Sequence, residues 1–259
     1  MARNIALVDP VLGPLTDDLL TPGVRVYQRA KGHRFSSDDV ATAYVAYSTR
    51  PNASRVLDLG CGLGSVLLLL AYKLPHAELA GVEAQAMSFE LLRRNVARSG
   101  FGARVRTVHG DLRDAALSSR VGRELDLITG TPPYFPPEAA LDAEDEQRAF
   151  ARIEYRGGVE AYIAAAAPLL ARDGALVLCG DARVGERTTS GALSAGLSVS
   201  ARCDVVARAG LSPLFSVWTL GFATRGCEIS RLTLRSETGA PTADAGRLRN
   251  FSGFDVSAS

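Results

Sequence analysis

The feature that most constrains the fold is a strand, a glycine turn and a helix in immediate succession. Residues 55–60 (RVLDLG) have the pattern of a short buried strand, and Gly60, Gly62 and Gly64 follow it. An apolar run then continues to residue 74, just before a proline. This order is typical of a βαβ unit, in which helices join parallel strands. Ligands bind such sheets at the carboxyl ends of the strands, so residues 58–64 mark the predicted binding site.

The same alternation continues along the chain. Strands are predicted over residues 78–83, 105–111, 125–132 and 172–180, helices over 87–99 and 158–171, and two or three further strands toward the end. The composition, with 47% hydrophobic and 22% charged residues, excludes a disordered chain. The 259 residues contain no repeat and no linker rich in Pro, Gly and Ser. We therefore predict one α/β domain with an amino-terminal extension.

Acidic side chains beside the predicted strands indicate which ligand the turn accepts. A dinucleotide-binding fingerprint would have its third glycine at position 65, where this chain has Ser65. Asp58, before the first glycine, suits an ammonium group better than a pyrophosphate. Glu83 can accept both hydroxyls of a ribose, and Asp111 can reach the amine of an adenine. An amino acid, a ribose and an adenine make up S-adenosylmethionine (SAM), which is the predicted cofactor.

A second motif, Thr131-Pro132-Pro133-Tyr134, follows the fourth predicted strand. The two prolines fix the backbone, so that the carbonyl of Pro132 can point at a substrate. An exocyclic amine could donate its two hydrogens to this carbonyl and to the Thr131 hydroxyl, which would turn its lone pair toward an electrophilic methyl group. A planar substrate could stack on Tyr134. These four residues are the predicted catalytic residues, and the chemistry needs no metal.

In these motifs the chain resembles the class I SAM-dependent methyltransferases, within the amino-methylating group marked by Asn/Asp/Ser-Pro-Pro-Tyr/Phe/Trp. It is most similar to the bacterial tRNA adenine-N6 methyltransferase family that acts on the anticodon loop of a valine tRNA. Further similarities to that family are TDDLL at residues 16–20, GHRFSSD at 32–38, ARIE at 151–154 and the ending LTLRSETGAPTADAGRLRNF. The resemblance covers residues 16–254.

The resemblance implies a Rossmann-like fold with a seven-stranded, mostly parallel sheet and helices on both faces. It implies an extension over residues 1–50 that packs on the core, a methyltransferase domain over 51–254 and a frayed tail over 255–259. The implied reaction is methyl transfer to an exocyclic amine, with adenine N6 in tRNA or another RNA as the first candidate. Arg34 and Phe35 would close over the cofactor. The cofactor-binding residues expected in full are Arg34, Phe35, Asp58, Gly60, Gly62, Gly64, Glu83, Ala84, Asp111, Leu112 and Thr131.

Two positions depart from the family pattern. Thr131 stands where the family has Asn, and a threonine offers no carboxamide acceptor. Ile153 stands where the relatives commonly have His, which removes a polar contact near the site. The loss of one good hydrogen bond costs about 1 kcal/mol, so the chemistry could persist with a slower rate or a different nucleophile.

An RNA-binding surface would have to be local, because 29 basic and 28 acidic residues give a net charge of +1. The candidates lie before the core, on the second helix and near the end of the chain: Arg25, Arg29, Lys31, Arg34, Arg93, Arg94, Arg98, Arg247 and Arg249. An acidic stretch over residues 138–146, read as a loop or short helix, would repel phosphate if it faced the site.

The sequence gives no support for a zinc site, a disulfide framework, a catalytic triad or a membrane span. The four cysteines form no C-x-x-C pair, so neither a zinc site nor a disulfide framework is expected, and a cytoplasmic location fits them. His33 and His109 lie near the expected cofactor face, but no catalytic triad can be assembled from their spacing. The longest apolar stretch has seven residues (66–72), against the ~20 that cross a bilayer, so neither a membrane span nor an export signal is expected.

Three alternatives stay open. The same chemistry could act on a protein side-chain amide or on a small planar amine or phenol. The chain could instead bind SAM without turnover. A nicotinamide-dependent oxidoreductase could also use this fold, although Ser65 and Asp58 disfavour it. No sequence pattern indicates an oligomeric state.

Overall fold

The computed structural model describes residues 5–135, 145–223 and 226–254. The predicted frayed tail (255–259) and most of the acidic stretch (138–144) lie outside these residues. The elements are β1 (Leu7–Asp9), β2 (Gly13–Thr21), β3 (Val24–Arg29), α1 (Ser37–Thr49), β4 (Arg55–Leu59), α2 (Ser65–Lys73), β5 (Glu78–Glu83), α3 (Ala86–Arg98), β6 (Val105–His109), α4 (Leu117–Val121), β7 (Leu125–Gly130), α5 (Glu146–Arg152), α6 (Val159–Ala166), η2 (Ala167–Leu169), β8 (Leu170–Gly180), η3 (Ala182–Val184), α7 (Gly185–Ser194), β9 (Ser198–Val206), β10 (Phe215–Gly221), β11 (Glu228–Thr233) and α8 (Ala243–Phe251).

The central sheet has the strand order β11-β9-β10-β8-β7-β4-β5-β6. The pairs from β8 to β6 are parallel, and β10 runs antiparallel to both of its neighbours. The predicted α/β class with a mostly parallel sheet is confirmed, but the count of seven strands is wrong, because β11 adds an eighth. β11 pairs in parallel with β9 and so satisfies backbone groups that β9 would otherwise expose at the edge of the sheet. Of its own side chains, β11 buries only Leu232.

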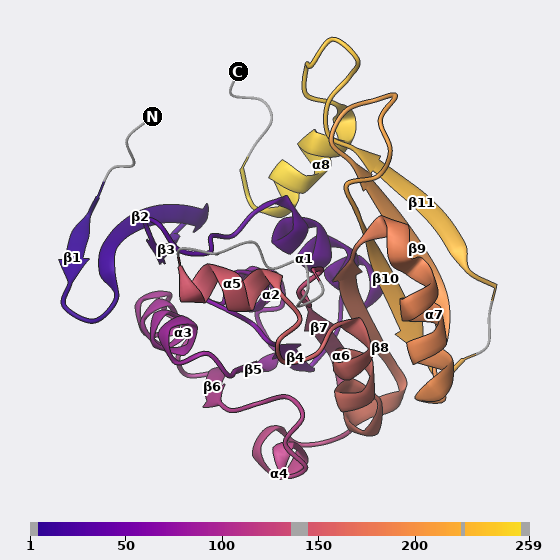
Figure 1. Ribbon diagram of the computed structural model, residues 1–259, viewed down its shortest axis with the longest axis horizontal. Coiled ribbons are helices and arrows are strands. Elements are labelled where there is room, and N and C mark those ends of the chain that lie inside the picture. Colours follow the sequence, from indigo (N-terminus) through magenta and orange to yellow (C-terminus); the bar gives the residue numbers. More distant parts are fainter. Residues whose placement is uncertain (1–4, 136–144, 224–225, 255–259) are drawn as a thin grey trace.

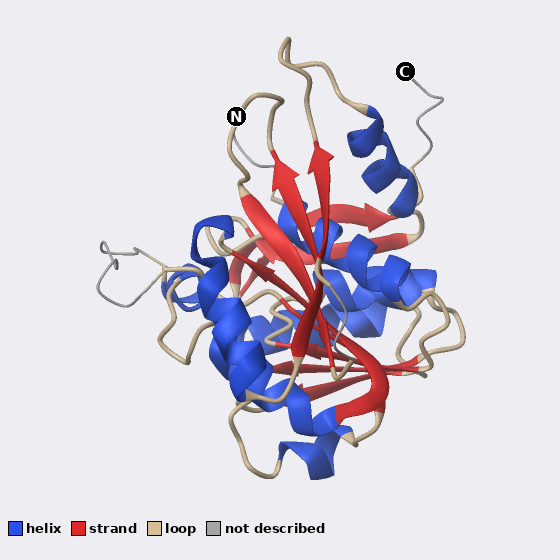
Figure 2. Cartoon of the chain, turned by 90° about the vertical axis from the view of Figure 1, so that its right-hand side faces the viewer, coloured by secondary structure: helices blue, strands red, loops and turns tan. Residues whose placement is uncertain are grey.

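Helices cover both faces of this sheet (Figures 1 and 2). Side chains alternate along each strand, so that Val56 belongs to one apolar core and Leu57 to the other. The first core lies against α1, α2, α3 and α8, and the second against α4, α6 and α7.

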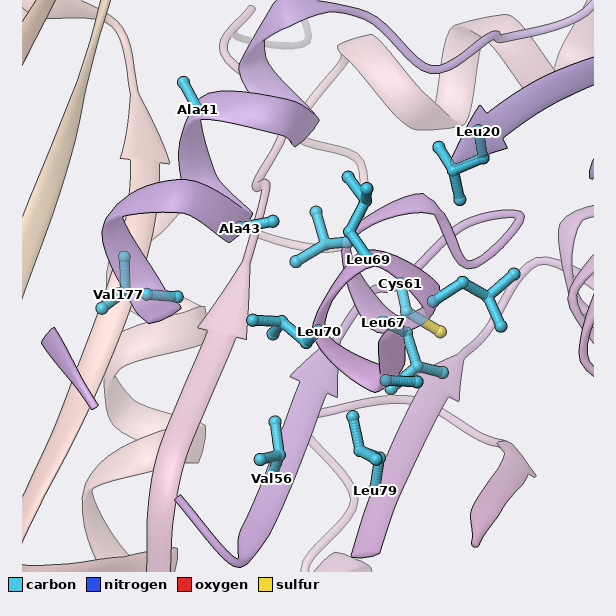
Figure 3. Packing of buried hydrophobic residues seen from close by; sticks show 14 of the residues in the cluster. Leu20, Ala41, Ala43, Val56, Cys61, Leu67, Leu69, Leu70, Leu79 and Val177 are labelled. Atoms are coloured by element: carbon cyan, nitrogen blue, oxygen red, sulfur yellow. The ribbon is translucent and has the colours of Figure 1, made fainter. Parts of the chain in front are cut away.

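The amino-terminal residues form a second, three-stranded sheet in the order β1-β2-β3, followed by α1. Leu20 of β2 and Ala41 of α1 share one core with Leu69 of α2, and Figure 3 shows this packing. The buried Asn95 of α3 accepts a hydrogen bond from the Tyr27 backbone N–H and donates to the carbonyls of Tyr27 and Leu63. The amino-terminal residues are therefore tied to the glycine turn, and the division at residues 50 and 254 stays a prediction.

The order of the strands creates a switch point beside β4. From β4 the chain first builds β5 and β6 on one side, then returns to build β7 and β8 on the other. Consecutive crossovers thus leave in opposite directions, which opens a crevice at the carboxyl ends of β4 and its neighbours.

Candidate active site

A cleft occupies this switch point. It is bordered by the glycine turn after β4, by the ends of β5 and β6, by the loop after β7 and by α5. The predicted site residues that line it are Phe35, Gly60, Gly62, Glu83, Ala84, Asp111, Leu112, Thr131 and Pro133. The predicted residues outside the lining are Arg34, Asp58, Gly64, Pro132 and Tyr134.

The glycines of the turn serve different purposes. All three have positive φ, between 56° and 94°, a conformation that favours glycine. Gly62 faces open space, and its backbone N–H donates to the Glu83 carboxylate at 2.9 Å. At Gly64 a Cβ would lie 2.7 Å from the Leu92 side chain. Gly64 therefore permits close packing of the turn against α3 rather than contact with a ligand.

Gly60 makes room for a side chain from α6. A Cβ on Gly60 would overlap the hydroxyl of Tyr162, and a Cβ on Gly130 would meet the same ring at 2.7 Å. Leu59 and Gly130 are partners in the register of β4 and β7, so the two glycines lie on adjacent strands. Tyr162 fills the space that both leave and also lines the cleft.

Asp58 lies directly beneath the turn and is only 1% exposed. Its Oδ1 accepts a hydrogen bond from the Thr129 hydroxyl at 2.8 Å. Its Oδ2 is buried and has no hydrogen-bond partner among the described residues. Burial raises the pKa of this carboxyl to about 7, against the effect of the Thr129 hydrogen bond.

Two other buried carboxyl groups, unlike Asp58, line the cleft. Asp39 of α1 accepts hydrogen bonds from the Ser65 hydroxyl and the Ser36 backbone N–H, both at 2.9 Å, and burial raises its pKa to about 7. Burial also raises the pKa of Glu83, although two backbone N–H groups donate to it. Together with Asp58 these groups suit a ligand that carries positive charge, because it would compensate buried carboxylates and could donate to the unpartnered Oδ2.

The raised pKa values predict how stability depends on pH. The folded chain keeps protons on Asp39 and Asp58 up to about pH 7, whereas the unfolded chain loses them near pH 3.8. The folded state therefore binds more protons across this window, and the free energy of unfolding falls as the pH rises through it. Burial lowers the pKa of His33, so this residue makes the free energy of unfolding rise with pH. Its effect ends at about pH 6.5, the ordinary pKa that His33 has in the unfolded chain.

We expect the ligand-free protein to lose about 1–3 kcal/mol of stability between about pH 6 and pH 8. Urea unfolding at several pH values measures this loss. Asp39→Asn should reduce it, because one of the two titrating groups is removed. A free energy of unfolding that stays flat or rises over this interval would contradict the prediction.

At the β6 end of the cleft, Asp111 forms an ion pair with Arg113 at 2.7 Å. The Arg113 hydrogen bond lowers the pKa of Asp111, so this carboxylate is charged at neutral pH. His33 lines the cleft, and burial lowers its pKa. His109 lies outside the lining and stacks on Phe89 with ring centroids 4.6 Å apart.

The loop after β7 presents Thr131 and Pro133 to the cleft, whereas Tyr134 points elsewhere. The Tyr134 hydroxyl forms a 2.6 Å hydrogen bond with Cys179 of β8, and burial raises the pKa of this phenol. The backbone N–H groups of Tyr134 and Phe135 donate to the Arg152 carbonyl. Tyr134 thus anchors the loop to the sheet in this conformation, and its ring is not part of the cleft wall.

Arg34 is held away from the cleft. Its guanidinium donates to the Thr16 hydroxyl at 2.7 Å and to the Asp18 carboxylate at 2.8 Å. It therefore connects the start of α1 to β2, while the neighbouring Phe35 lines the cleft as predicted.

Several residues of the cleft were not predicted from the sequence. They come from the start of α1 and α2, from the segment after β5, and from α5 to the start of α6: Asp39, Ser65, Gln85, Ser88, Gln147, Phe150, Ala151, Arg156 and Tyr162. Ile153, noted as a departure from the family pattern, is also in the lining. The ARIE segment was the one signal in the sequence that α5 and its end belong to the site.

Most of the basic residues predicted for RNA binding are engaged in ion pairs. The pairs are Arg25–Asp17, Arg29–Asp145, Arg34–Asp18, Arg93–Glu90, Arg94 with Asp9 and Glu90, Arg98–Asp17, and Arg247–Asp244. The ion pairs among the described residues include neither Lys31 nor Arg249. Arg94 and Arg98 thus join α3 to the amino-terminal sheet, and Arg29 joins that sheet to the start of α5, whereas Arg25 and Arg93 pair within their own sheet or helix.

Comparison with known proteins places this cleft in a family context. A family model described as methyltransferase small domain matches residues 34–198. A tRNA1(Val) (adenine(37)-N6)-methyltransferase of Porphyromonas gingivalis is 38% identical over 123 residues, which are 47% of this chain and 48% of that protein. A release factor glutamine methyltransferase of Chlorobaculum tepidum is 36% identical over 132 residues, covering 48% of this chain and 44% of that protein. Each match thus spans about half the length of these relatives or less.

A solved structure supports the fold alone. A crystal structure described as that of a predicted O-methyltransferase from Agrobacterium tumefaciens superimposes with a TM-score of 0.61 at 19% identity. The superposition covers 83% of this chain and 96% of that one.

Proposed function

The chain belongs to the methyltransferase small domain family, and from this premise we propose that it transfers a methyl group from SAM to adenine N6 of a tRNA. The observation that carries the proposal is that Thr131 and Pro133 line the same cleft as the glycine turn and the buried carboxyl groups. A site for a polar exocyclic amine therefore adjoins a site for a cation. The similarity to the Porphyromonas tRNA methyltransferase favours tRNA as the substrate.

The cleft has the donor and acceptor groups that SAM requires. Glu83, which lines the cleft, would accept the ribose hydroxyls. Asp58 lies beneath the lining, and its unpartnered Oδ2 would hold the ammonium group once a shift of the glycine turn admits it. Asp111 and Leu112 would border the adenine. Bound SAM supplies an electrophilic methyl group.

The protein's own contribution is to position the target amine. The Thr131 hydroxyl, which lines the cleft, would accept one N–H of the amine. The Pro132 carbonyl lies outside the lining and would have to turn toward the cleft to accept the other, so that together they aim the nitrogen lone pair into the cleft. Apolar side chains of Ile153 and Phe150, which line the cleft, would exclude water around the nitrogen. Catalysis in this scheme comes from orientation and fixed dipoles, without a protein nucleophile.

A protein side-chain amide is the second candidate substrate. The similarity to the Chlorobaculum release factor glutamine methyltransferase favours it, and a glutamine amide presents the same two N–H groups as an adenine amine. Thr131 in place of the family's Asn leaves both candidates open.

The test is methyl transfer from isotope-labelled SAM into separated RNA, protein and small-molecule fractions of an unmethylated extract, with Asp58→Ala as the blank. We expect label in tRNA that is recovered after digestion as N6-methyladenosine. Label confined to the protein fraction would replace tRNA by a protein amide. SAM binding without any transfer would indicate a binding module, and NAD binding without SAM binding an oxidoreductase.

Thr131 provides a sharper prediction for the same assay. Thr131→Ala removes one acceptor for the amine and should lower kcat about tenfold, since one transition-state hydrogen bond contributes about 1–2 kcal/mol. Thr131→Asn restores an acceptor and should retain at least the wild-type rate. SAM affinity serves as the control and should change little. Equal rates for Thr131→Ala and the wild type would show that Thr131 does not hold the amine.

The remaining observations concern location and metals. Within the described residues, every helix is too short or too polar to span a bilayer. The same part of the chain holds no cluster of three or more His, Cys, Asp or Glu side chains able to bind a metal ion. A cytoplasmic location belongs to the proposal, because that is where a tRNA substrate is found.

A further inference from the structure

A group of basic and aromatic side chains borders the mouth of the cleft on α5 and just beyond it. We call Arg148, Phe150, Arg152, Tyr155 and Arg156 the α5 rim. Phe150 and Arg156 line the cleft itself, whereas Arg148, Arg152 and Tyr155 are exposed. The rim therefore leads from the outer surface directly to the predicted position of the target amine.

The guanidinium groups of the rim differ from those of β3 and α3. The ion pairs among the described residues include none of Arg148, Arg152 and Arg156, in contrast to the paired arginines of β3 and α3. Arg148 and Arg152 are four residues apart on α5, so they lie on the same side of this helix. Both oppose the protonation of His33 in the cleft, although Asp38 at the start of α1 acts in the other direction. Positive charge is thus concentrated beside the cleft.

The aromatic side chains of the rim are arranged around Phe150. The ring of Tyr155 lies edge-on to that of Phe150 with centroids 5.3 Å apart, and the Arg156 guanidinium lies 4.6 Å from the Phe150 centroid. Tyr155 is 46% exposed, and nearby Phe135 is 42% exposed. Large exposed aromatic rings beside arginines that form no ion pair with another described residue are what proteins use to bind unstacked nucleotides.

The rim is held in a fixed position by contacts behind it. Phe135 and Ile153 form a parallel β-bridge, in which the Glu154 backbone N–H donates to the Phe135 carbonyl at 2.9 Å. The Glu154 side chain accepts two hydrogen bonds from Arg187 of α7, at 2.8 and 2.9 Å. A surface that is ordered before its ligand arrives loses less conformational entropy on binding.

We propose that the α5 rim binds the nucleotides that flank the target base in a single-stranded segment of RNA, with Arg148 and Arg152 on phosphates and Tyr155 stacked on a base. This inference rests on the proposed function, because it concerns the substrate of the same cleft. A loop or single strand is required, since a base can stack on Tyr155 only where its neighbours have unstacked. A peptide substrate would use the aromatic rings but not the phosphate-binding charge.

The role of the positive charge on the α5 rim is tested with the double variant Arg148→Ala/Arg152→Ala. Its affinity for fluorescently labelled tRNA is measured over a range of KCl concentrations and compared with that of the wild type. We expect affinity to fall at least tenfold at low salt and the slope of log affinity against log salt to decrease by about 1–1.5, as two phosphate contacts are lost. Arg231→Ala is the control for loss of a surface charge away from the cleft, because Arg231 is exposed on β11 at the far edge of the sheet from α5 (Figure 1). SAM affinity should be unchanged in both.

The stacking is tested with Tyr155→Ala and Tyr155→Phe. Loss of one base stack should weaken tRNA binding about tenfold in Tyr155→Ala, whereas Tyr155→Phe keeps the ring and should bind as the wild type does. If the wild type methylates tRNA and the rim variants bind and methylate it equally well, the rim assignment is overturned and the proposed function stands. If the wild type neither binds nor methylates tRNA, both are overturned.

Discussion

Replacing Asp58 by Asn is expected to weaken SAM binding by about a hundredfold or more at pH 8, because removing one partner of a buried charge pair costs about 3–5 kcal/mol. The carboxyl group is almost fully buried, and its Oδ2 has no partner among the described residues. An ammonium group would supply both the missing charge and the missing donor. Isothermal titration calorimetry with SAM measures the change.

The pH dependence of binding separates this electrostatic role from simple misfolding. Burial raises the pKa of Asp58 to about 7, so below pH 7 the carboxyl must lose its proton before it can pair with a cation. Wild-type affinity should therefore fall as the pH is lowered from about 8 to 6, by up to about tenfold per unit. Asp58→Asn has no such proton to lose, and its residual affinity should vary less.

Asp126→Asn is the matched control for this change. Asp126 accepts backbone hydrogen bonds from Ser54 and Arg55, at the opposite end of the sheet from the cleft. Its replacement removes the same charge without touching the site, so SAM affinity should persist. A folded Asp58→Asn protein that binds SAM as tightly as the wild type would remove Asp58 from the cofactor site.

The positions of the acidic residues were predictable because parallel strands bring their carboxyl ends to one edge. Glu83 is the last residue of β5 and Asp111 follows β6, and both reach the cleft as expected. The glycine turn was equally readable, since it joins a strand to a helix. The family resemblance seen in these motifs is confirmed by the family model that matches residues 34–198. Local order along the chain was sufficient for these features.

The features that sequence reasoning missed depend on contacts between distant residues. Arg94 pairs with Asp9 across 85 positions, so no local pattern could show that this arginine is engaged. Gly64 resembles the other glycines of its turn, yet its role is set by Leu92 of α3. The direction of Tyr134 is likewise fixed by Cys179 of β8, 45 positions away. Whether an arginine or an aromatic ring faces a ligand was decided by tertiary packing.

Gly60 carries the other large expected effect. Gly60→Ala should lower the free energy of unfolding by about 3 kcal/mol, because it adds strain at φ +59° and overlap with Tyr162. Gly62→Ala is the matched control, since φ is +56° there but a Cβ would meet no heavy atom within 4 Å. It should lose only the strain contribution, about 1–2 kcal/mol. Urea unfolding measures both.

The overlap can be isolated with a second change on α6. Tyr162→Leu removes the ring that a Cβ at position 60 would meet, so Gly60→Ala should cost less in that background than in the wild type. A coupling of about 1–3 kcal/mol is expected for two side chains in direct conflict. Additive losses would mean that backbone strain alone requires glycine at position 60. If Gly60→Ala lowers the free energy of unfolding by less in the Tyr162→Leu background, the first glycine of the turn is required by the packing of α6 on the sheet. This requirement would exist in addition to any close approach of the cofactor.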